Sequence, residues 1–196
     1  MNLKLLFLSI LAAAFLNCSA QLQVKAAVFG VPTSAGGAFI GHAGFEYLLK
    51  ERRQSLELNY HMSRWSGIGS DGPEPSRKWI TAAFQCFIGK NEIRKSGFLS
   101  FFTEIGTRKI TPGFIDFVGD SILSGDRASE IAPGVSVGKN FSMGKRWSIQ
   151  PQAGPKIIFA RYTTSYYHRI SSTFTEQKHN EIKAGLRFQF SFCYQL

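Results

Sequence analysis

The sequence predicts an all-β fold: an eight-stranded antiparallel up-and-down barrel that crosses a membrane. Three observations predict it, namely strict alternation of apolar and polar residues, an N-terminal export signal, and links of unequal length. The alternation is clearest over 181–196, where every second residue from Ile182 to Leu196 is apolar and those between are polar or small. Because hydrocarbon tolerates neither polar side chains nor open sheet edges, such a strand suits lipid outside and a polar lumen inside.

The N-terminus has the organisation of a cleavable signal peptide over 1–20. Lys4 gives a positive start, residues 5–16 are apolar, and the small residues Ser and Ala follow Cys18. No other apolar stretch approaches the roughly 20 residues of a transmembrane helix. We therefore expect a mature chain of one β-barrel domain over 21–196.

Eight alternating segments recur along the chain, and each is bounded by turn-forming residues. We expect strands over 22–31, 37–50, 54–65, 77–89, 97–107, 130–139, 146–162 and 181–194. Short links at 51–53, 90–96 and 140–145 alternate with long ones at 66–76, 108–129 and 163–180. Such links are typical of outer-membrane barrels, which have short periplasmic turns and longer outward loops.

Alternation does not show which face is inside, and a soluble barrel of the lipocalin type would turn its apolar face inward. Aromatic residues favour lipid outside, because they gather near both ends of the strands like the two belts at membrane interfaces. They are Tyr47, Trp147 and Tyr194 near the short turns, and Tyr60, Trp65, Trp79 and Tyr162 near the long loops.

The C-terminal segment 183–190 reads KAGLRFQF, a polar-x-Gly-x-x-aromatic-x-aromatic pattern formed by Lys183, Gly185, Phe188 and Phe190. With this pattern, the mature chain resembles the small eight-stranded outer-membrane β-barrel proteins of Gram-negative bacteria. Those proteins usually end at the final aromatic residue, whereas this chain continues to Leu196. The resemblance implies contact with outer-membrane lipids and with the barrel assembly machinery during biogenesis, but it says little about activity.

With lipid outside, long polar side chains of both signs enter the lumen. An eight-stranded barrel is only about wide enough for its own side chains, so they should pair and close it. We predict a polar network of Lys25, Glu46, Glu57, His61, Glu104, Lys156, Lys183 and Arg187. A narrow transport path or small-ligand site in the lumen is an alternative. No cofactor or metal is expected.

Candidates for catalysis are His61 and Ser63, because a family of lipid-A deacylases among such barrels carries a His-x-Ser pair. Glu57, on the same side of the strand, lies about 13 Å from His61 at about 3.3 Å per residue, too far to orient it. Both candidates also point inward, away from lipid. We therefore expect a non-enzymatic envelope structural or surface-interaction protein, with a lipid-A or phospholipid-modifying enzyme as the alternative.

Positive charge concentrates in the short turns. Only Glu51 and Glu92 oppose the basic residues there, which are Lys50, Arg52, Arg53, Lys90, Arg94, Lys95, Lys139, Lys145 and Arg146. This rim should contact anionic phospholipid headgroups or cell-wall polymer. Nucleic-acid binding is not indicated, because no binding motif or aromatic platform accompanies the charge.

Two long links have unusual composition. The link at 107–129 is apolar for a surface segment, so we expect it to fold over the barrel mouth. The link at 163–180 is rich in aromatic, Ser and Thr residues, which suits either a surface ligand or, as we prefer, a hairpin that extends the last two strands.

Overall fold

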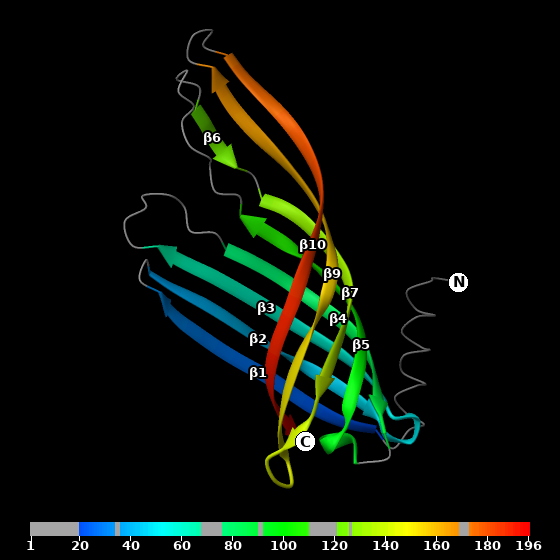
Figure 1. Cartoon of the computed structure of the whole chain (residues 1–196). Coiled ribbons are helices and arrows are strands. Elements are labelled where there is room, and N and C mark those ends of the chain that lie inside the picture. Colours follow the sequence, from blue (N-terminus) through cyan, green and yellow to red (C-terminus); the bar gives the residue numbers. More distant parts are fainter. Residues whose placement is uncertain are drawn as a thin grey trace, which may run out of the picture.

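A computed structural model describes residues 20–33, 36–67, 76–89, 92–109, 121–125, 127–168 and 173–196 (Figure 1). The eight expected strands are present as β1 (Ala20–Thr33), β2 (Gly36–Leu49), β3 (Gln54–Gly67), β4 (Ser76–Ile88), β5 (Gly97–Lys109), β7 (Arg127–Lys139), β9 (Trp147–His168) and β10 (Thr173–Gln195). Short elements join them: β6 (Ser121–Gly125), β8 (Phe141–Ser142) and the 3₁₀ turns η1 (Lys50–Arg52) and η2 (Ile93–Lys95). Residues 1–19 of the predicted signal peptide lie outside the described residues.

The eight long strands form one antiparallel sheet that closes into a ring. Each long strand pairs with the next one along the chain, and β10 pairs with both β9 and β1. The predicted all-β, antiparallel up-and-down fold is therefore confirmed. No helix in the described part of the chain is long and apolar enough to cross a membrane.

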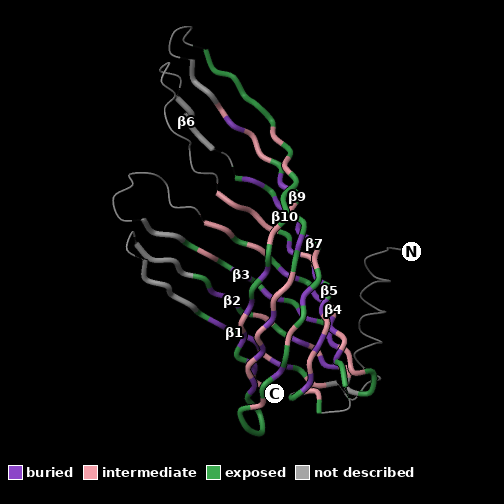
Figure 2. Tube along the Cα trace, in the orientation of Figure 1, coloured by how far each residue is buried: buried purple, intermediate pink, exposed green. Residues whose placement is uncertain are grey.

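Burial alternates along the strands and shows which face is inside (Figure 2). On β10, Arg187 and Gln189 are buried, whereas their neighbours Leu186 and Phe188 are 64% and 77% exposed. The other long strands also alternate between buried and more exposed side chains along most of their described lengths, and most of the large exposed side chains are apolar. The ring is polar inside and apolar outside, the reverse of a lipocalin-type barrel.

The seam between β1 and β10 is much shorter than the other pairings. It runs from Gln23↔Gln195 to Ala26↔Phe192, whereas β10 pairs with β9 along the whole of its length. Beyond this point β1 stays with β2 and β10 stays with β9, so the two strands diverge (Figure 1). Among the described residues, the ring is closed at its short-turn end and the seam is open toward the long-loop end.

The link at 163–180 is largely a hairpin extension, as preferred from the sequence. β9 and β10 remain paired up to His168↔Thr173. β6 pairs with the extension of β9 from Ser121↔Tyr167 to Gly125↔Thr164. Part of the link at 107–129 therefore widens the hairpin, while 110–120 and 126, and with them most of the predicted cover over the mouth, lie outside the described residues.

An apolar cluster, here called the apolar plug, lies at the short-turn end of the ring. Leu48, Phe87 and Phe98 are buried on the inner face, and Ile93 of η2 packs against them. The rings of Phe87 and Phe98 meet edge to face, with centroids 5.9 Å apart. This plug was not predicted, because other inner-face residues of the same strands, such as Glu46, Gln85 and Glu104, are polar.

Candidate functional site in the charged interior

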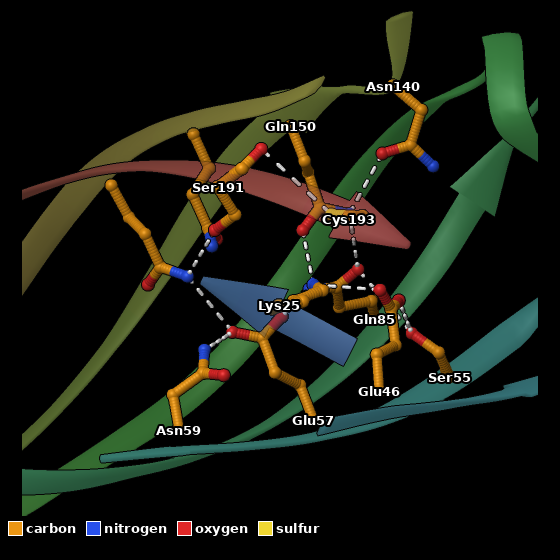
Figure 3. Close-up of polar contacts among 12 residues, drawn as sticks. Lys25, Glu46, Ser55, Glu57, Asn59, Gln85, Asn140, Gln150, Ser191 and Cys193 are labelled. Atoms are coloured by element: carbon orange, nitrogen blue, oxygen red, sulfur yellow. Dashed lines mark hydrogen bonds and ion pairs between the residues drawn. The ribbon is translucent and has the colours of Figure 1, made fainter. Parts of the chain in front are cut away.

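The centre of the interior is Lys25, which is fully buried on β1. Its Nζ lies 2.8 Å from Glu46 Oε2 and 2.5 Å from Glu57 Oε2, and it also donates a hydrogen bond to Gln150 (Figure 3). Ser55 Oγ donates to Glu46 Oε1 at 2.5 Å. Strands β1, β2, β3 and β9 are therefore connected through one buried ammonium group.

Glu57 accepts hydrogen bonds from several strands at once. Gln85 Nε2 on β4 donates to Oε2 at 2.5 Å, and Gln189 Nε2 on β10 donates to Oε1 at 3.2 Å. Asn59 donates to the same carboxylate, and Arg187 Nη2 lies 3.7 Å from Oε1. A buried carboxylate is stable only when its charge is paired and its lone pairs are used, and Glu57 meets both conditions.

Arg187 connects this cluster to a second one nearer the long-loop end. Its guanidinium lies 4.2 Å above the Phe102 ring, and its Nε is 3.9 Å from Glu104 Oε1. Glu104 Oε2 also pairs with Lys156 Nζ at 2.7 Å and with Arg77 Nη2 at 3.3 Å. The interior is thus filled across its width by charge-paired side chains.

Glu130 completes the second cluster and was missed in the sequence prediction, as were its two partners. Arg77 Nε and Arg108 Nε each lie 2.8 Å from its carboxylate. Arg77 and Glu130 are the first residues of the predicted strands 77–89 and 130–139, for which the predicted network names no residue. Arg77 shares its face with the buried Gln85, and Glu130 shares its face with the buried Ser136.

Six of the eight predicted network residues lie in the two clusters, and two do not. His61 is buried, but its Nε2 has no hydrogen-bond partner among the described residues. The prediction for Lys183 is wrong: its side chain is 57% exposed and pairs with Glu181 at 2.5 Å. Lys183 has the inner-face position, but its ammonium pairs with Glu181 on its own strand, whereas Arg187, four residues nearer the short-turn end, is buried against Phe102 and the carboxylates of Glu57 and Glu104.

Glu181 is held in the extended hairpin by two donors. Lys183 Nζ and Tyr162 Oη contact its carboxylate, the latter at 2.6 Å. The hydrogen bond from Tyr162 joins β9 to β10 through their side chains.

Two of the predicted interface aromatics face the wrong way. Trp79 alternates with the buried Thr81 and points inward, where it stacks on His61 at 4.9 Å with Arg77 over its ring at 4.6 Å. Tyr162 also points to the inner face and stacks on His179. The outward set comprises Tyr47, Tyr60, Trp147 and Tyr194, while the Trp65 side chain lies outside those the structure describes.

The predicted His61–Ser63 pair has no catalytic geometry. The His61 ring stacks on Trp79 and makes a tilted contact with His42, and Ser63 is half-buried with no hydrogen bond to His61 among the described residues. The carboxylate of Glu57, the acid nearest to this pair in the sequence, is already paired with Lys25. The pairing therefore gives neither an activated hydroxyl nor an oriented imidazole.

A different pair is in contact: His42 Nε2 lies 3.0 Å from Ser191 Oγ, and both are buried. His42 is on β2 and Ser191 is on β10, and the small Ala27 of β1 lies between them. No carboxylate of the described residues hydrogen-bonds His42, so a triad is incomplete. The contact instead joins β2 to β10 across β1, at the row where the seam ends. The separation of 149 residues hides it in the sequence.

Fold and interior together define a class: an all-β protein with a closed antiparallel ring, charged inside and apolar outside. Within the described ranges, no three His, Cys, Asp or Glu side chains are grouped so that they could hold a metal ion. No protein-family model matches the chain, and no curated protein sequence matches it.

Proposed function

We propose that this chain is an outer-membrane β-barrel protein with a closed, salt-bridged lumen, which acts as an envelope structural or surface-interaction protein. The observation that carries the proposal is the interior, in which Lys25, Arg187 and Lys156 are paired with buried carboxylates across the width of the ring. Such a lumen leaves its charged groups committed to one another rather than to a solute or a substrate.

The apolar outer face supports membrane insertion. Proteins in water seldom expose contiguous apolar patches of more than a few hundred Å². Here large apolar side chains, each at least 45% exposed, occur on β2, β3, β4, β5, β7, β9 and β10, for example Phe45, Leu58, Ile80, Ile105, Ile131, Phe159 and Phe188. The predicted signal peptide and the C-terminal pattern ending at Phe190 favour the outer membrane and delivery by the barrel assembly machinery.

The two ends of the barrel support a closed protein with an outward surface. The apolar plug of Leu48, Phe87 and Phe98 lies at the short-turn end, and its buried side chains favour a lumen that is closed there. At the opposite end, the β9–β10 hairpin extends well beyond the closed seam, with Glu176 and Lys178 exposed on it. We infer that this hairpin is the part available to an envelope or extracellular ligand.

The proposal is tested with full-length mature protein refolded into phospholipid vesicles. We expect it to float with the vesicles in a density gradient, to migrate faster unheated than heated in detergent gels, and to give no discrete current steps in planar bilayers. Failure to float would refute membrane insertion, and discrete current steps would refute the closed lumen. Lipid mass spectrometry on cells with and without the protein tests the enzyme alternative, and a mass change lost in Ser63→Ala or Ser191→Ala would refute the non-enzymatic proposal.

A further inference from the structure

Two apolar grooves follow one another on the outer face of β7, β9 and β10. The first, of about 630 Å³, is lined chiefly by Val137, Phe141, Pro151, Ala153, Phe188 and Phe190, and Ile40 of β2 also lines it. The second, of about 720 Å³, is lined chiefly by Pro133, Val135, Pro155, Ile157, Ala184 and Leu186. Along each strand the lining residues of one groove continue into those of the other, so the two form one track.

The sequence explains why a track forms on these strands. Pro133 and Pro155 cannot donate backbone hydrogen bonds, and the β7–β9 pairing is interrupted between Ile131↔Phe159 and Gly134↔Lys156. On the outer face, Ala153 and Ala184 are small where neighbouring positions carry Phe or Leu. The outer surface is therefore recessed along the track relative to the neighbouring positions.

The short-turn end of the track carries positive charge that pairs with no acid among the described residues. Lys139 lines the first groove, and its Nζ lies 5.2 Å from the centre of the Phe141 ring. Lys145 and Arg146 are exposed in the same turn, and the stretch 139–146 contains no Asp or Glu. In the turn between β4 and β5, by contrast, Lys95 pairs with Glu92 at 3.7 Å.

The track has the length of one membrane leaflet. From Lys139 to Pro133 there are six residue steps of about 3.3 Å each, or about 20 Å along the strand. Strands of small barrels tilt by about 45°, so the vertical extent is about 14 Å, close to half of a hydrocarbon core about 30 Å thick. An acyl chain in the track would therefore place its headgroup beside the basic turn.

We propose that this face binds one anionic glycerophospholipid, with an acyl chain in the track and the phosphate beside Lys139, Lys145 and Arg146. The inference rests on the proposed membrane function and adds a particular lipid site to it. The three basic side chains favour an anionic over a zwitterionic headgroup. Their position at the short-turn end, the predicted periplasmic side, places the lipid in the leaflet made of phospholipid.

The test is native mass spectrometry of the mature protein released from vesicles of equal parts phosphatidylglycerol and phosphatidylcholine. Wild type should retain one phosphatidylglycerol. Lys139→Gln with Lys145→Gln should lower that retention about tenfold or more, since each near-surface cation contributes about 1 kcal/mol. The matched charge control is Arg52→Gln with Lys95→Gln in the other two turns, which should retain the lipid.

A second pair of variants tests the track itself. Ala153→Phe should fill the groove and abolish retention of the lipid, whereas Ala82→Phe on the outer face of β4 should not. Equal retention of phosphatidylcholine, preferential retention of added lipid A, or retention that survives both the charge and groove variants would overturn the proposal. Vesicle flotation of each variant separates these outcomes from a failure of membrane insertion, because a protein that floats yet retains no lipid contradicts the site alone.

Discussion

Replacing Lys25 by Met tests whether the buried charges stabilise the barrel as a set. The substitution keeps the volume but leaves two carboxylates without their shared cation. Glu57 retains Arg187 at 3.7 Å and its amide donors, whereas Glu46 retains only the Ser55 hydroxyl. Breaking a buried pair by removing one partner costs about 3–5 kcal/mol, and most of that cost should fall on Glu46.

Urea unfolding in detergent, followed by Trp fluorescence, measures this cost. Lys25→Met should lower the free energy of unfolding by about 3–5 kcal/mol, and adding Glu46→Gln should recover about half of the loss or more. The matched control is Lys183→Met, whose exposed ion pair should be worth no more than about 1 kcal/mol. A loss from Lys25→Met as small as the control, or a double variant in which the two losses simply add, would refute the reasoning.

Phe98→Ala should remove the centre of the apolar plug and cost about 3–5 kcal/mol in the same assay, whereas Phe101→Ala on the outer face should cost far less. If the β1–β10 register continued, Val28 would lie opposite Phe190. With the native cysteines replaced by Ser, cysteines introduced at these two positions should therefore form no disulfide on oxidation if the seam is open, and a disulfide would show that it is closed there.

Alternation predicted the strands well where one face is buried and poorly where neither is. The eight segments and the inner position of Lys25, Glu57 and Arg187 follow from a period of two, which is a local property. β10 begins at Thr173 rather than at 181, because the hairpin beyond the ring has no buried face to impose the pattern.

Alternation gives the face of a residue but not its height in the barrel. Lys183 and Arg187 both have the predicted inner-face position, yet only Arg187, four residues nearer the short-turn end, lies within the charged interior. Trp79 could have been placed correctly, since its spacing from Thr81 already puts it inside. The His42–Ser191 contact could not have been predicted from the sequence, because it depends on the closure of the ring.

The short seam also determines the order in which the molecule can assemble. Every other pairing in the ring joins strands that follow one another in the sequence, so each can form as a local hairpin. The pairs from Gln23↔Gln195 to Ala26↔Phe192 instead join the two ends of the chain, and their loop-closure entropy is the largest in the fold. Growth by successive hairpins would reduce that cost, because it carries β10 back beside β1. Ring closure should therefore be the last and slowest step of folding. Until β10 pairs with it, β1 should be hydrogen-bonded to β2 along one edge and unpaired along the other.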